Sequence, residues 1–131
     1  METLADMRDS GKSIEELYHW IENNKLRMHH WFFSTDLTFY IKGGRISRTA
    51  GMVGSILNIC PLLNMDNIGK LKPREKLRGK KKVIQRIVEM MEQHAENGLN
   101  YNGKCYICHS VCLEDAKTVA ALVEKKSSHT Y

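Results

Sequence analysis

Apolar residues at helical spacing mark most of the chain. Behind the capping-box residues Ser13 and Glu16, one apolar stripe predicts a helix that runs to about residue 25. Residues 1–12 are expected to be the tail of a preceding helix, because helical spacing there stops at Gly11. The same spacing predicts further helices over residues 36–40, 47–58, 81–94 and 113–126.

Short apolar runs bounded by turn residues predict the strands, which cover residues 29–33, 59–65, 70–78 and 105–109. A turn at residues 66–69 joins the second and third runs, so these two are expected to form a hairpin. Pro73 cannot donate a hydrogen bond to a neighbouring strand, which places the third run at a sheet edge. Because helices and strands interleave, we predict an α/β fold of the two-layer α+β kind, with helices packed on a mixed sheet.

The composition fits one globular domain, with 131 residues of which 42% are hydrophobic. No apolar run approaches the ~18–20 residues that a membrane-spanning helix needs, so no membrane span is expected. The N-terminus lacks the basic and then apolar pattern of a secretory signal, so a cytoplasmic location is expected. In that compartment the four cysteines are expected to be free thiols.

Three of these cysteines and a histidine lie within eight residues, at Cys105, Cys108, His109 and Cys112. Cys105, Cys108 and His109 match the attachment pattern of c-type haem, and haem attachment of this kind requires export to an oxidising compartment. Zinc sites draw four ligands that usually come in two separated pairs, and a second pair is missing here. The sequence therefore favours a buried strand in which cysteines pack as small hydrophobic residues, with no metal site; thiol or zinc chemistry stays open as the alternative.

Eight cations lie within thirteen residues at 70–82, with a single acidic residue among them. From 70 to 78 they occupy every even position, so a regular strand would present them on one face. Three interpretations stay open: an edge protected from aggregation by charge, a docking face for an acidic protein, and a nucleic-acid site. The last is the weakest, because no aromatic residue stands among the cations to stack on bases.

Arg45 follows two glycines, which leave its guanidinium room to reach a carboxylate or a phosphate. A salt bridge with a local carboxylate such as Asp36 is the alternative.

The helix predicted over residues 47–58 carries Gly51 and Gly54, and each costs ~1 kcal/mol relative to alanine. A strand or a ligand pressed against that helix would account for them. No triad or paired carboxylates stand out, so no catalytic residue is predicted.

Three linked motifs point to a known family. They are DLTFYIKGGRIS at residues 36–47, GSILNICPLL at residues 54–63 and LRGKKK at residues 77–82. In this order and at these separations they resemble the second domain of the DegV family of fatty-acid-binding proteins. The capping segment at residues 11–16 is similar to the family's helix that leads into that domain.

The resemblance implies that residues 1–131 are a partial, C-terminal-domain fragment of a protein about twice as long. The family holds the tail of a long-chain fatty acid in this domain and carries the acid to a fatty acid kinase; its members are not enzymes and use no cofactor. Arg45 is then expected near the mouth of the lipid site. Acyl-chain contacts are expected from Met52, Val53, Ile56, Leu57, Leu62 and Leu63, with core packing as the alternative for each.

The resemblance also assigns kinase docking to Arg78, and we add its neighbours Lys76 and Lys80. A domain that lacks part of its sheet exposes strand edges, so a homodimer formed through those edges is expected. A basic protein- or nucleic-acid-interaction module without bound lipid is the alternative function.

Overall fold

Three strands organise the computed structural model, which describes residues 1–47 and 58–127. The strands are β1 (Trp31–Phe33), β2 (Ile59–Met65) and β3 (Leu71–Arg78), in the order β1-β2-β3, and both pairings are antiparallel. The predicted hairpin is confirmed, and Pro73 lies on an outer strand of this three-stranded sheet, as expected. At the turn, the Asp66 carboxylate accepts hydrogen bonds from the amides of Ile68 and Lys70.

The helices follow the apolar periodicity of the sequence. They are α1 (Glu2–Asp9), α2 (Ile14–Asn24), α3 (Thr38–Lys42), α4 (Lys80–His94) and α5 (Leu113–Ser127), with short 3-10 turns η1 (Lys25–Arg27) and η3 (Gly98–Asn100). Ser13 and Glu16 form the predicted capping box at the start of α2. The helix predicted over residues 47–58 lies, apart from its two end residues, outside the described residues. The predicted α/β fold class is confirmed, but the described strands form an antiparallel sheet and not the mixed sheet that was expected.

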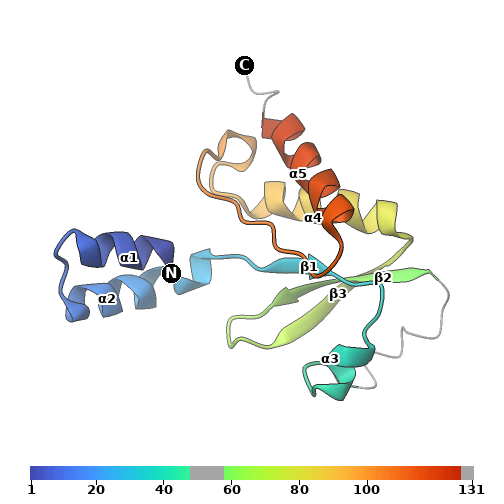
Figure 1. Cartoon of the computed structure of the whole chain (residues 1–131), viewed down its shortest axis with the longest axis horizontal. Coiled ribbons are helices and arrows are strands. Elements are labelled where there is room, and N and C mark those ends of the chain that lie inside the picture. Colours follow the sequence, from blue (N-terminus) through green and yellow to red (C-terminus); the bar gives the residue numbers. More distant parts are fainter. Residues whose placement is uncertain (48–57, 128–131) are drawn as a thin grey trace.

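Helices lie on both sides of the sheet (Figure 1). α4 and α5 lie over one face, α3 lies on the opposite side, and the hairpin of α1 and α2 projects away from the sheet. Within the described residues, no helix is long and apolar enough to cross a membrane.

The face under α4 holds the larger core cluster. Val83 and Ile87 of α4 pack there against Cys60 and Leu62 of β2, and Val119 of α5 joins them. Along α4 the buried residues are Val83, Ile84, Ile87, Val88 and Met90. Met91, which also follows the apolar spacing of this helix, is only half-buried.

The opposite face holds a second, smaller cluster. Leu63 of β2 packs there with Leu37 and Ile46, which flank α3. Phe32, Tyr40, Ile41 and Leu71 pack around these three. Successive residues of a strand point to opposite faces, so Leu62 and Leu63 belong to different clusters.

A β-bulge interrupts β3 and overturns one expectation. Leu62 is opposite Glu75, but Leu63 is opposite Pro73, so Arg74 is the extra residue on β3. As a result Leu77 packs against the larger cluster and Leu71 against the smaller one. The residues at odd positions of β3 therefore point to one face before the bulge and to the other face after it. The cations at even positions must change face at the same point. The prediction that all cations of residues 70–78 share one face is therefore wrong.

The predicted strand at residues 105–109 is also wrong. In the described chain, residues 101–112 form neither helix nor strand, and every one of them is exposed. Cys105, Cys108 and Cys112 are exposed free thiols, whereas Cys60 is buried in β2. A short apolar run needs a neighbouring strand to become part of a sheet, and none of the described strands pairs with this segment.

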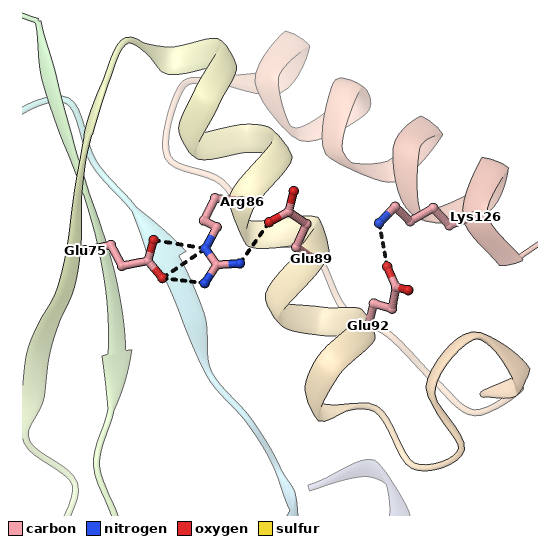
Figure 2. Close-up of polar contacts among 5 residues, drawn as sticks. All are labelled: Glu75, Arg86, Glu89, Glu92 and Lys126. Atoms are coloured by element: carbon pink, nitrogen blue, oxygen red, sulfur yellow. Dashed lines mark hydrogen bonds and ion pairs between the residues drawn. The ribbon is translucent and has the colours of Figure 1, made fainter.

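A polar network ties the sheet to its helical layer (Figure 2). Arg86 of α4 donates to Glu75 of β3 through Nε and Nη2, at 2.7 to 2.9 Å, and to Glu89 through Nη1 at 2.8 Å. Lys126 of α5 donates to Glu92 of α4 and so links the two helices. The hydrogen bonds from Arg86 lower the pKa of the Glu75 carboxyl.

Candidate functional site

An open hollow of about 520 Å³ lies between the segment after α3 and the start of β3. Its lining combines cations with apolar surface. The cations are Arg45, Lys70 and Lys72; the other lining residues are Gly44, Ile46, Ser47, Gly69, Leu71 and Pro73. Ile46 and Leu71 also belong to the smaller core cluster, so the hollow borders that cluster directly.

The turn after α3 positions Arg45 at this hollow. Gly44 has a φ of +70°, a left-handed conformation that glycine adopts without strain. The amides of Arg45 and Ile46 both donate to the Tyr40 carbonyl, at 2.9 and 3.3 Å, which fixes the turn against the end of α3. Ile46 is buried while Arg45 is exposed. The guanidinium therefore lies at the surface, directly beside an apolar residue of the cluster.

The described contacts of Arg45 and Asp36 do not pair them. Arg45 Nη1 donates to the Gly43 carbonyl. Asp36 Oδ1 accepts hydrogen bonds from the Thr38 hydroxyl at 2.6 Å and the Thr38 amide at 2.8 Å. These bonds lower the pKa of Asp36 and occupy its carboxylate at the start of α3. The Arg45 guanidinium has further donors, which can reach a ligand carboxylate.

The β2–β3 turn supplies the other side of the hollow. Asp66 holds this turn, and hydrogen bonds led by the Lys70 amide lower the pKa of its carboxyl. Asp66 Oδ2 also lies 3.8 Å from Lys72 Nζ. Asp66 therefore offsets part of the positive charge of Lys72 beside the hollow.

The structure separates the predicted acyl-chain residues. Leu62 and Leu63 are both fully buried, but Leu62 packs under α4 and Leu63 packs in the cluster that borders the hollow. The other four, Met52, Val53, Ile56 and Leu57, lie outside the described residues. Among the described members of the predicted set, Leu63 is therefore the one that lies on the same side of the sheet as Arg45.

The predicted docking residues fall on two elements. Lys76 and Arg78 are exposed and lie opposite Pro61 and Ile59 in the β2–β3 ladder, so they share a face. Lys80 instead begins α4 and pairs with Asp115 of α5 at 2.9 Å. That hydrogen bond raises the pKa of Lys80.

Lys70 and Lys72 were expected only as members of a basic strand, not as neighbours of Arg45. Their approach depends on the packing of Leu71 with Ile46 across 25 positions of sequence, which no local pattern reveals. The Gly43-Gly44-Arg45 turn was enough to predict Arg45 as a site residue, but it gave no indication of Lys70 or Lys72.

The described fold is that of a family with known structures. A family model described as "Uncharacterised protein, DegV family" matches residues 1–131. The chain belongs to the DegV family.

Curated and solved relatives agree with this assignment. The DegV domain-containing protein CPE0026 of Clostridium perfringens is 38% identical over 122 residues, which are 93% of this chain and 41% of that protein. The chain thus spans between 31% and 41% of the length of these curated relatives. A DegV family protein of Ruminococcus gnavus, solved with vaccenic acid, is 25% identical with a TM-score of 0.75 and covers 94% of this chain and 43% of its own.

A further likeness concerns the fold alone. The fatty acid kinase (Fak) B3 protein of Streptococcus pneumoniae, solved with linoleic acid, has a TM-score of 0.79 at 21% identity. The match covers 97% of this chain and 44% of that one.

Proposed function

We propose that this chain forms part of a carrier for a long-chain fatty acid and takes no part in catalysis. The observation that supports this proposal is the hollow, where Arg45, Lys70 and Lys72 adjoin Ile46 and Leu71 of an apolar cluster. A fatty acid has the same two parts, an anionic head and an apolar tail. The fatty acids in solved DegV relatives support the same ligand class.

The energetics favour such a site without catalytic groups. Each methylene of the tail that leaves water contributes ~0.8 kcal/mol, so a long chain supplies most of the binding free energy. The Arg45 guanidinium would hold the carboxylate through charge-assisted hydrogen bonds, with the two lysines adding electrostatic attraction. Leu63 and the four predicted residues outside the described part would contact the tail.

Replacing Arg45 by alanine is expected to weaken binding of oleate about 10-fold, which corresponds to ~1.4 kcal/mol and to the loss of a charge-assisted hydrogen bond. Titration of the delipidated 131-residue chain with labelled oleate measures this. Lys42→Ala is the matched control, because Lys42 is exposed at the end of α3 and does not line the hollow. Oleate bound equally well by the Arg45 variant, or not bound by the chain at all, would contradict the proposal.

We further propose that the exposed pair Lys76 and Arg78 docks a fatty acid kinase, which receives the bound acid. The name of the Streptococcus pneumoniae relative supports this class of partner. Lys80 is a weaker member of the docking set, because its ammonium already binds Asp115. Two expectations from the sequence remain predictions: a cytoplasmic location, and a homodimer formed through exposed strand edges.

Arg78→Glu is expected to abolish detectable kinase binding while oleate binding is unchanged, since Arg78 does not line the hollow. A pull-down of the kinase with immobilised chain, run beside the oleate titration, separates the two properties. Lys117→Glu makes the same charge change on an exposed face of α5 and should leave docking intact. Undiminished kinase binding by Arg78→Glu would rule out this docking face.

The alternative of a nucleic-acid module loses its main support. It depended on a continuous cationic face along residues 70–78, and the bulge at Arg74 distributes those cations over both faces of the strand. A phosphate backbone would meet fewer charges on either face than the sequence pattern implies.

A further inference from the structure

The outer side of β3 is an open strand edge in the described part of the chain. β3 pairs with β2 on one side, and none of the described strands lies on its other side. An unpaired edge offers a row of backbone N–H and C=O groups to a further strand. In the same sheet, β1 pairs with β2 over only three residues. Even a short stretch of the β3 edge is therefore long enough to accept an extended segment.

The hydrogen-bond pattern of the hairpin shows which groups of β3 face outward. The Gly79 amide donates to the Asn58 carbonyl at 2.8 Å. Hydrogen-bonded pairs alternate along an antiparallel ladder, so the next bonded residue of β3 is Leu77. The amides and carbonyls of Lys76 and Arg78 therefore point away from β2, toward the open side.

The usable part of this edge is limited at both ends. Pro73, before the bulge at Arg74, has no amide hydrogen to offer a further strand. After the strand, Gly79 has a φ of +89° and α4 begins at Lys80, so the chain leaves the sheet. What remains is the run of residues 76–78, which is as long as β1.

The side chains along this run select by charge. Lys76 and Arg78 are exposed. Glu75, the single acidic residue of β3, faces α4 instead, where Arg86 binds it (Figure 2). A second copy of the chain that paired through the same run would set cation against cation, and like charges directly opposite destabilise paired strands. Carboxylates at alternate positions of a foreign strand would be attracted.

We propose that residues 76–78 bind an extended acidic segment of a protein partner as an added β-strand. The outward backbone groups supply main-chain hydrogen bonds, and two acidic side chains of the segment lie opposite Lys76 and Arg78. The side chain between them lies beside Leu77, at the margin of the larger core cluster, which suits an apolar residue. This inference rests on the docking face proposed above for a kinase, and it adds the form of the segment that the face recognises.

A short peptide in which glutamate and valine alternate is the probe for the test. Added to the full 131-residue chain, it should slow the hydrogen exchange of the Lys76 and Arg78 amides, measured by NMR, because both amides gain a partner. The Leu77 amide is already bonded to β2 and should change little. A peptide of alternating lysine and valine should slow none of them. The acidic peptide methylated on its backbone nitrogens should bind at least ~10-fold more weakly, because it cannot donate to the outward carbonyls.

Two substitutions at one position separate the backbone from the charge. Lys76→Gln and Lys76→Pro both remove the ammonium, but only the proline also removes the outward amide, which bonds to no described strand. Glutamine should lower the affinity for the acidic peptide about 3-fold, and proline a further ~5-fold. Lys117→Gln, on an exposed face of α5, is the control and should bind the peptide as the unmodified chain does.

Three results would overturn the proposal. The acidic peptide could leave the exchange of the Lys76 and Arg78 amides unchanged, or its backbone-methylated form could bind equally well. The two amides could also become protected in the chain alone as its concentration rises, which would assign the edge to a second copy. If such a result accompanied kinase binding that Arg78→Glu abolishes, the kinase docking face would stand and strand addition alone would be refuted.

Discussion

Replacing Leu62 by alanine is expected to lower the free energy of unfolding by about 2–5 kcal/mol. Leu62 is fully buried at the centre of β2 and packs in the larger cluster with Val83 and Ile87 of α4. The substitution removes apolar burial and leaves a cavity that the neighbouring strand and helix can fill only in part. A loss of this size is a large fraction of the stability of a small domain.

Urea unfolding followed by far-ultraviolet circular dichroism measures the change. Ile68→Ala is the control: Ile68 is 75% exposed in the β2–β3 turn, so its loss should cost less than about 0.5 kcal/mol. Equal unfolding free energies for the two variants would show that the cluster under α4 is not the core of the folded chain.

The elements with the clearest local signals were predicted well. The start of α2 follows from a capping box, and α4 and α5 follow from apolar stripes, because each signal depends only on residues a few positions apart. Pro61 illustrates a subtler case. The Gly79 amide donates to the Asn58 carbonyl, and hydrogen-bonded pairs alternate along an antiparallel hairpin, so Pro61 falls between two such pairs and its nitrogen points away from β3. On that other side β1 has already ended, opposite Leu62. The missing amide hydrogen of Pro61 therefore breaks no bond between strands, and the central strand tolerates the proline.

The failures have a different physical origin. In β3 the alternation of cations continues unbroken through Arg74, so the amino-acid sequence gives no sign of the bulge. The bulge is a property of the pairing with β2, in which Leu63 meets Pro73. At residues 105–109 the apolar letters resemble a strand, but a strand requires a partner. In both cases the outcome depends on contacts between segments, which the hydrophobic pattern does not encode.

The candidate site divides in the same way. The Gly43-Gly44-Arg45 turn is local, and its arginine was found. The hollow around it forms only when the β2–β3 turn is brought to Arg45 by the packing of Leu71, Ile46 and Leu63. Predicting Lys70 and Lys72 as its neighbours therefore required the fold.

Replacing Arg86 by methionine is expected to lower the free energy of unfolding at neutral pH by about 1–2 kcal/mol. The side chains of Arg86 and Glu75 are 27% and 35% exposed, so the pair lies between an exposed ion pair, worth ~0.2–1 kcal/mol, and charge-assisted hydrogen bonds, worth ~1.5–3 kcal/mol. Glu75 faces α4 from β3 (Figure 2), and without the guanidinium its carboxylate remains half-buried with its main partner removed.

The effect should depend on pH in a defined direction. Hydrogen bonds from Arg86 lower the pKa of Glu75 in the folded chain from its ordinary value of 4.5. A carboxyl with a lowered folded pKa stabilises the fold above its unfolded pKa, and this stabilisation is lost as the pH falls through the folded pKa. The difference between the Arg86→Met chain and the unmodified chain should therefore be largest above pH 4.5 and shrink as the solution is acidified below it.

Urea unfolding of both chains across a pH series tests this prediction. Lys117→Met is the matched control, because it removes a cation from an exposed pair with Glu114, whose side chains are 61% and 84% exposed. That variant should lose less than about 0.5 kcal/mol at any pH. The Arg86 variant could instead lose the same free energy of unfolding at every pH, down to strongly acidic solution. That result would show that packing of the arginine stem, and not its charge beside Glu75, holds β3 to α4.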